Sequence, residues 1–79
     1  MKIINLGFDN CVAAARVVCI ADAHAAPMKR LREEAQKNHK LVDVTSGRRT
    51  RSIVITDSGH VILSGMQPAT LTQRLEEAK

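Results

Sequence analysis

The sequence predicts a small α+β domain in which a mostly antiparallel β-sheet is combined with two helices. Runs of β-branched apolar residues bounded by turn residues indicate strands. Two segments with apolar side chains at helical spacing, each opened by a proline, indicate helices. The length of 79 residues allows one domain, spanning residues 1–79, and no repeat or linker divides it.

Strand patterns occupy five segments: residues 2–6, 16–21, 41–45, 52–56 and 60–64. Residues 11–15 are ambiguous, because small apolar side chains suit either a strand or a helical turn. The sequence Asp57-Ser58-Gly59 lies between the last two strands and predicts a hairpin. Several strands are apolar at consecutive positions, so both faces of the sheet should be buried.

One helix is expected over residues 27–38 and a second one from Pro68 onwards. Pro27 suits the first helical turn, where its missing N–H leaves no hydrogen bond unmade. Asn38 is expected in the left-handed conformation that ends many helices. The apolar face of the first helix consists of Met28, Leu31 and Ala35.

Covering both faces of the sheet is the main difficulty for so short a chain. Two short helices are expected to cover only one face. We therefore expect a second copy of the chain to cover the other, which also suits a chain too small for a large core. The alternative is that the N-terminal segment covers this face from within the chain.

The cysteine and histidine patterns predict neither a disulfide nor a metal site. Cys11 and Cys19 lie in apolar surroundings and no secretory signal precedes them, so we expect buried, reduced thiols and a cytoplasmic location. His24, His39 and His60 are scattered without the spacing of metal ligands. No apolar run approaches the ~20 residues of a membrane-spanning helix, which predicts a soluble chain.

The charge pattern favours a polyanionic partner over catalysis. The net charge is +4, and Arg48, Arg49 and Arg51 fall within four positions before a strand. Like charges this close repel, so we expect a negative group opposite them, in the chain or in a partner. Common nucleophile, phosphate-loop and dinucleotide motifs are missing from the sequence, so we expect neither an enzyme nor a cofactor.

The aromatic content narrows the class of nucleic-acid binding. Phe8 is the only aromatic residue, whereas single-strand binders and sequence-reading RNA modules stack bases on several aromatic rings. Recognition of duplex DNA by arginine remains, through phosphates, guanine edges or a narrow minor groove. Four alternatives stay open: a solvated basic loop, a small anion near Gly47, a basic surface that docks an acidic protein, and an RNA-associated factor.

Longer motifs connect the chain to a known family. Residues 47–51 read GRRTR and are followed by ITDSGHVILS at 55–64 and by Gln67-Pro68. With Arg16 at the head of an earlier strand, these segments closely resemble the RemA family of bacterial extracellular matrix regulatory proteins. The resemblance covers nearly the whole chain in register.

This resemblance implies a DNA-binding transcriptional regulator without a helix-turn-helix, of the type that controls biofilm matrix genes. It also implies a LytTR-like, β-rich fold and assembly into a homo-oligomeric ring. DNA contacts are implied for Arg16, Arg48 and Arg49, and Arg51 lies in the same motif. The family usually has an aromatic residue where Ser46 stands, and its loss here should remove packing beside Arg48.

Overall fold

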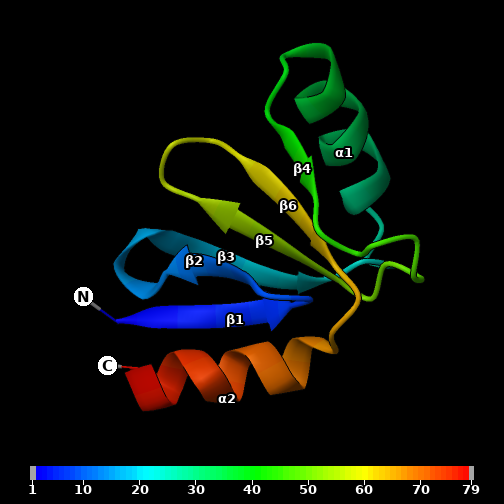
Figure 1. The fold of residues 1–79 in the computed structure, drawn as a ribbon. Coiled ribbons are helices and arrows are strands. Elements are labelled where there is room, and N and C mark those ends of the chain that lie inside the picture. Colours follow the sequence, from blue (N-terminus) through cyan, green and yellow to red (C-terminus); the bar gives the residue numbers. More distant parts are fainter. Residues whose placement is uncertain (1, 79) are drawn as a thin grey trace.

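The computed structural model describes residues 2–78, which form six strands, two α-helices and one short 3-10 helix (Figure 1). Residues 11–15, ambiguous in sequence, are divided between a strand and the 3-10 helix. In chain order the elements are β1 (Ile3–Gly7), β2 (Asn10–Ala13), the 3-10 helix (Ala14–Arg16), β3 (Val17–Asp22), α1 (Met28–Lys37), β4 (Leu41–Asp43), β5 (Ser52–Thr56), β6 (Val61–Ser64) and α2 (Pro68–Ala78).

The strands form two sheets rather than one. Strands β3 to β6 make a four-stranded sheet in the order β3-β5-β6-β4, and β1 pairs with β2 in a separate antiparallel hairpin. All pairs are antiparallel except β4 with β6, so the predicted mostly antiparallel arrangement is confirmed. The strand predicted over residues 41–45 ends at Asp43, because the chain turns away from β6 at Thr45.

Helix α1 covers one face of the four-stranded sheet. The inward side chains of α1 pack against alternate residues of β5 and β6, as the two-residue period of a strand requires. The buried members of this first cluster are Ala23, Met28, Ala35, Ile53, Val61 and Leu63. The side chains between them on β5 and β6 point to the opposite face and need other cover.

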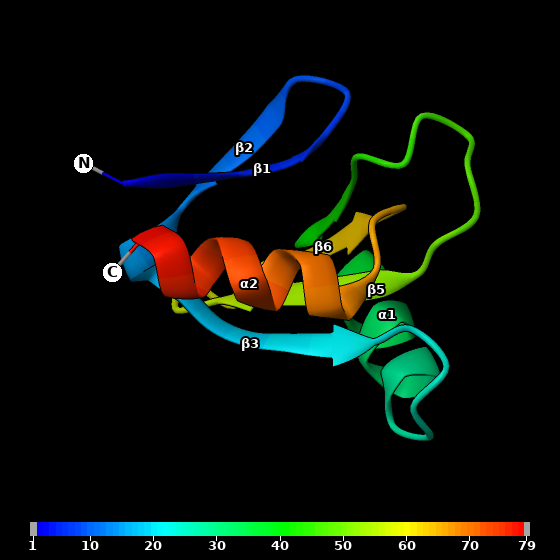
Figure 2. The same ribbon diagram turned by 90° about the horizontal axis from the view of Figure 1, so that it is seen from below.

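The β1–β2 hairpin and α2 supply that cover from within the chain (Figure 2). The second cluster consists of Ile4, Leu6, Val54, Ile62 and Leu71. The expectation that a second copy of the chain covers this face is therefore wrong. The two helices lie on opposite faces, and the N-terminal hairpin adds a layer beside α2, so both faces are covered internally.

The left-handed residue that follows α1 lies one position later than the sequence predicts. Asn38 has φ −92°, while His39 takes the left-handed conformation with φ +58°. The Lys40 amide donates to the Ala35 carbonyl at 2.8 Å, and the His39 amide donates to Gln36 at 3.3 Å. This is a Schellman cap, in which the left-handed position follows the C-cap rather than coinciding with it. Within residues 2–78, neither helix has the length and apolar character needed to cross a membrane.

Candidate nucleic-acid interface

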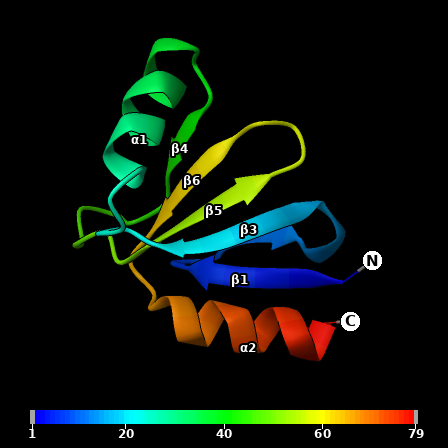
Figure 3. The same ribbon diagram turned by 180° about the vertical axis from the view of Figure 1, so that it is seen from behind.

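Arg48, Arg49 and Arg51 lie in one loop at one edge of the molecule. This segment, residues 44–51, connects β4 to β5 and is called the arginine loop below. Strands β1, β3 and β6 all end at the same edge, as the arrowheads in Figures 1 and 3 show. The topology therefore brings the loop next to the β1–β2 turn, the β3–α1 connection and the start of α2.

The arginine loop begins with a hydrogen-bonded turn. The Asp43 carboxylate accepts hydrogen bonds from the Thr45 hydroxyl at 2.6 Å and from the Thr45 amide at 2.9 Å. The hydroxyl bond, then the amide bond and then the charge of Arg32 lower the pKa of Asp43 below its usual 3.8, against an opposing effect of burial. The turn is thus held by a charged carboxylate at neutral pH.

Left-handed backbone then reverses the chain. Ser46 has φ +53° and Gly47 has φ +80°, and the Arg48 amide donates to the Thr45 carbonyl at 3.0 Å. Glycine adopts such a φ without steric cost, which explains its position before the arginines. Consecutive turns therefore present the arginine side chains outwards.

The far end of the loop is fixed to two neighbouring segments. The Arg51 amide donates to the Ser64 carbonyl of β6 at 2.9 Å, and the Arg51 carbonyl accepts from the Ala23 amide at 3.1 Å. Gly65 lies beneath the loop, where a Cβ would be only 3.5 Å from the Arg49 carbonyl oxygen. The loop backbone is thereby attached to the sheet at both ends.

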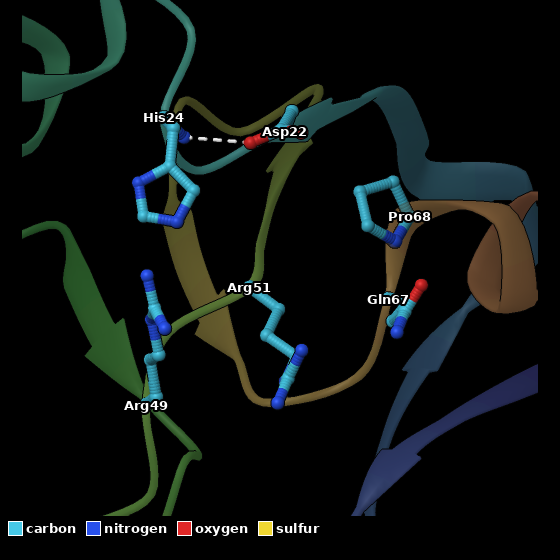
Figure 4. A pocket seen from close by; sticks show the side chains of 6 residues that line it. All are labelled: Asp22, His24, Arg49, Arg51, Gln67 and Pro68. Atoms are coloured by element: carbon cyan, nitrogen blue, oxygen red, sulfur yellow. Dashed lines mark hydrogen bonds between the residues drawn. The ribbon is translucent and has the colours of Figure 1, made fainter.

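Arg49 and Arg51 face a shallow cavity of about 220 Å³ (Figure 4). The Arg49 guanidinium points toward the His24 ring, and Arg51 extends toward the side occupied by Gln67. Two other segments, the end of β3 with the β3–α1 connection and the start of α2, supply the remaining lining residues, namely Asp22, His24, Gln67 and Pro68. The cavity therefore collects hydrogen-bond donors from residues far apart in sequence, an arrangement suited to an anionic group.

No carboxylate neutralises these arginines within the described residues. Across residues 2–78, no acidic oxygen comes within 4 Å of the Arg48, Arg49 or Arg51 guanidinium groups. Asp22 lines the same cavity, but its carboxylate accepts the His24 amide at 2.8 Å. Among residues 2–78 the fold therefore supplies no ion-pair partner within 4 Å of the three guanidinium groups.

Arg48 faces the other side of the loop, where it meets the only aromatic ring of the chain. The Cζ atom of Arg48 lies 5.5 Å from the centroid of the Phe8 ring, a cation–π distance. Both belong to a second cavity of about 360 Å³, whose other lining residues are Leu6, Gly7, Arg49, Arg51, Gly65 and Met66. Phe8 thus places an aromatic ring beside Arg48 although position 46 is serine.

Arg16 lies apart from the other three arginines. It immediately precedes β3, at the opposite end of the sheet from the arginine loop. Its guanidinium pairs with the Asp57 carboxylate at 2.9 Å, and its carbonyl accepts the Asp57 amide at 2.9 Å. The five residues of β5 separate the two ends by roughly 17 Å at about 3.3 Å per residue. One chain does not bring all four predicted residues together.

The structure adds three residues that sequence reasoning did not assign to the site. His24 and Gln67 line the first cavity, and Phe8 contacts Arg48. Gln67-Pro68 was part of the motif that resembles the RemA family, but no spacing rule connects it to arginines 16 or more positions away. Only the folded topology shows that these side chains are neighbours.

Within residues 2–78, the cysteine thiols form no disulfide, and His, Cys, Asp and Glu side chains form no metal-binding group. Cys11 and Cys19 are both free, and Cys11 is exposed, which corrects the expectation of two buried thiols. Cys11 points outwards because it alternates on β2 with Val12, which packs into the second cluster. Among residues 2–78, no three His, Cys, Asp or Glu side chains group together as metal ligands would.

Known proteins provide a second line of evidence. One relative, from Nitratidesulfovibrio vulgaris strain DP4, carries the provisional name of a regulatory protein. It is 57% identical to this chain over 76 residues, which cover 96% of this chain and 88% of the relative. Two further relatives with the same provisional name are each 53% identical. The match to the Geobacillus thermodenitrificans protein covers 95% of this chain and 86% of the relative. The match to a Synechococcus protein covers 99% of this chain and 88% of the relative. The family profile described as extracellular matrix regulatory protein A-like matches residues 3–75. The chain therefore belongs to the RemA-like family.

Proposed function

We propose that this protein is a DNA-binding transcriptional regulator that contacts duplex DNA through Arg48, Arg49 and Arg51 of the arginine loop. The observation that carries the proposal is the set of three exposed guanidinium groups without an acidic partner among residues 2–78. Arginine forms a planar, permanently charged fork that suits phosphate oxygens and guanine edges. The provisional names of the relatives support a regulatory role.

The fixed backbone of the arginine loop suits a ligand with regularly spaced charges, such as duplex DNA. The arginine loop is hydrogen-bonded to β6 and to the β3–α1 connection, so the backbone positions from which its arginine side chains extend are set before a ligand arrives. Phosphates along a duplex are also regularly spaced, and backbone contacts fix the register of a protein on DNA. A preorganised loop backbone therefore loses little backbone conformational entropy on binding.

We further propose that the protein acts as a homo-oligomeric ring, as its resemblance to the RemA family implies. In a ring, every subunit presents its own arginine loop, and contacts that are weak singly multiply through high effective concentration. Arg16 then contributes to DNA binding from a separate position on each subunit. Contacts along a curved rim favour bent or wrapped DNA, which circular-permutation assays measure directly.

Replacing Arg48 or Arg49 by alanine is the direct test. Each variant is expected to lose about 1–3 kcal/mol of DNA-binding free energy while keeping its oligomer size, because the side chains are exposed and outside both core clusters. Arg30→Ala is the matched control, since Arg30 is an exposed helical arginine paired with Glu34. Gel shifts at two salt concentrations measure binding, and light scattering measures oligomer size.

The same gel shifts are repeated with RNA and heparin in place of duplex DNA. Stronger binding of duplex DNA than of heparin at matched charge supports the proposal. Equal affinity for all three polyanions would reduce the site to a general basic surface, and unchanged DNA binding by the Arg48→Ala, Arg49→Ala double variant would overturn the assignment. A monomer that ignores duplex DNA would overturn both parts.

A further inference from the structure

Phe8 occupies a position that the core does not explain. It is the only aromatic residue of the chain, yet its side chain is 53% exposed and belongs to neither core cluster. An exposed phenylalanine on a chain of this size gains little from burial. Its identity therefore needs a reason other than packing in the core.

The backbone around Phe8 is held in an unfavourable conformation. Phe8 and Asp9 form the turn between β1 and β2 with φ +52° and +64°, a region that costs energy for residues with a Cβ. The side-chain Nδ2 of Asn10 donates to the carbonyls of Gly7 and Phe8, both at 3.1 Å, and the Asn5 side-chain oxygen accepts from the Gly7 backbone amide at 2.7 Å. These hydrogen bonds hold the turn backbone from which the Phe8 side chain extends.

The ring projects toward the arginine loop. Its centroid lies 5.5 Å from Cζ of Arg48, and both residues line the same cavity. Arg48 has no carboxylate partner within 4 Å among residues 2–78, whereas its guanidinium group lies over the Phe8 ring. A long, exposed arginine otherwise samples many rotamers, and each must be frozen when a ligand binds.

We propose that Phe8 is a positioning residue for DNA binding, whose ring holds the Arg48 guanidinium in its DNA-facing orientation. The inference rests on the proposed function and adds to it a residue that lies 40 positions before Arg48. Phe8 acts through Arg48 and lowers the rotamer entropy that binding would otherwise cost. The strained β1–β2 turn is retained because it aims the ring at the arginine.

Phe8→Leu tests the proposal with least disturbance to the fold. Leucine keeps an apolar side chain and a Cβ at the same strained position but has no π face. It is expected to weaken duplex DNA binding about two- to fivefold, the range of an exposed cation–π contact. Phe8→Trp is the conservative control and should bind as well as the wild type, because tryptophan has the strongest π face. Circular dichroism confirms that each variant is folded.

Two readouts separate positioning from a direct role of Phe8 on DNA. In the Arg48→Gln background, Phe8→Leu should cause no further loss of affinity, because the residue that the ring orients is gone. In the free protein, the Arg48 Nε–H proton should show a ring-current shift in NMR spectra that Phe8→Leu removes.

The contrary outcomes are equally clear. Unchanged DNA binding by Phe8→Leu, or an equal loss with and without Arg48, would refute positioning. A missing ring-current shift would do the same without reference to DNA. If the wild type ignores duplex DNA, the proposed function fails, while the NMR measurement still decides whether Phe8 holds Arg48.

Discussion

Asp43 connects a single side chain to the shape of the arginine loop. Its carboxylate accepts two hydrogen bonds from Thr45, a residue only 2% exposed, at the point where β4 gives way to the loop. The pKa of Asp43 is lowered mainly by the Thr45 hydroxyl, so the ionised form is the one the folded state favours. The stability of this turn therefore depends on pH.

The direction of that dependence follows from linkage. Because the folded pKa lies below the usual value of 3.8, Asp43 stabilises the fold above 3.8, and this contribution is lost as the pH falls through the folded pKa. Thermal unfolding of the wild type and of Asp43→Asn should differ at neutral pH and converge in acid. A gap that stays constant at every pH would contradict this role. Asp9→Asn, at an exposed turn, is the control variant.

At the residue scale, sequence alone identified the arginines but not their surroundings. Three arginines in four positions are visible as a local pattern, and so is the glycine before them. The Phe8–Arg48 contact joins positions 40 apart, and the His24 ring reaches the first cavity from the β3–α1 connection. No periodicity encodes such pairs, because they result from strands that end at a common edge.

Helix α2 is the element that links the two sheets. Leu71 is 0% exposed and packs with Ile4 and Leu6 of β1 and with Val54 of β5. The Arg74 guanidinium donates to the Asn5 carbonyl at 2.7 Å, which adds a polar contact between α2 and β1. The helix thus holds the N-terminal hairpin against the four-stranded sheet.

Leu71→Ala is expected to lower the free energy of unfolding by about 2–5 kcal/mol, because it opens a cavity at the centre of the second cluster. Leu75→Ala is the matched control: Leu75 lies one turn later and is only partly buried, so a smaller loss is expected. Urea unfolding measures both. A loss below about 1 kcal/mol for Leu71→Ala would mean that α2 does not anchor the hairpin.

Elements with local signatures were predictable, and their arrangement was not. Apolar spacing and proline placed both helices, and Asp57-Ser58-Gly59 placed the β5–β6 hairpin, whose pairing the structure confirms. The end of α1 was misjudged because His39, not Asn38, takes the left-handed position. The covered second face was misjudged because composition does not show on which face α2 or the N-terminal hairpin packs.

At the scale of the whole molecule, both faces of the four-stranded sheet are covered from within the chain, so an uncovered face gives no reason for self-association. The chain no longer requires a partner to complete its core, so ring assembly rests on the family resemblance. Two strands, β3 and β4, form the free edges of the four-stranded sheet, and Val18 on β3 is 68% exposed at a β-bulge. Bulges and short strands are common ways of limiting edge-to-edge pairing.

Salt dependence measures how many subunits hold DNA at once. Each phosphate contact contributes about 0.9 to the slope of log affinity against log salt. If Arg49→Ala removes one contact from every engaged subunit, the slope should fall by about 0.9 times the number of engaged subunits. Light scattering gives the total number of subunits in the oligomer, with which the number of engaged subunits is compared. If the salt slope of Arg49→Ala equals the slopes of the wild type and of Arg30→Ala, a phosphate contact by Arg49 is excluded.

The hydrogen bond from the Ser64 hydroxyl to the Leu6 carbonyl, 2.9 Å long, joins residues 58 positions apart. The Leu6 side chain packs in the same cluster as Leu71, which is synthesised after Ser64. During synthesis from the amino end, the β1–β2 hairpin is made first but must wait for α2 before its apolar face is covered. We therefore expect the nascent chain to expose that face until α2 has emerged from the ribosome, so that emergence of α2, rather than synthesis of the arginine loop, marks the moment at which a binding-competent subunit exists.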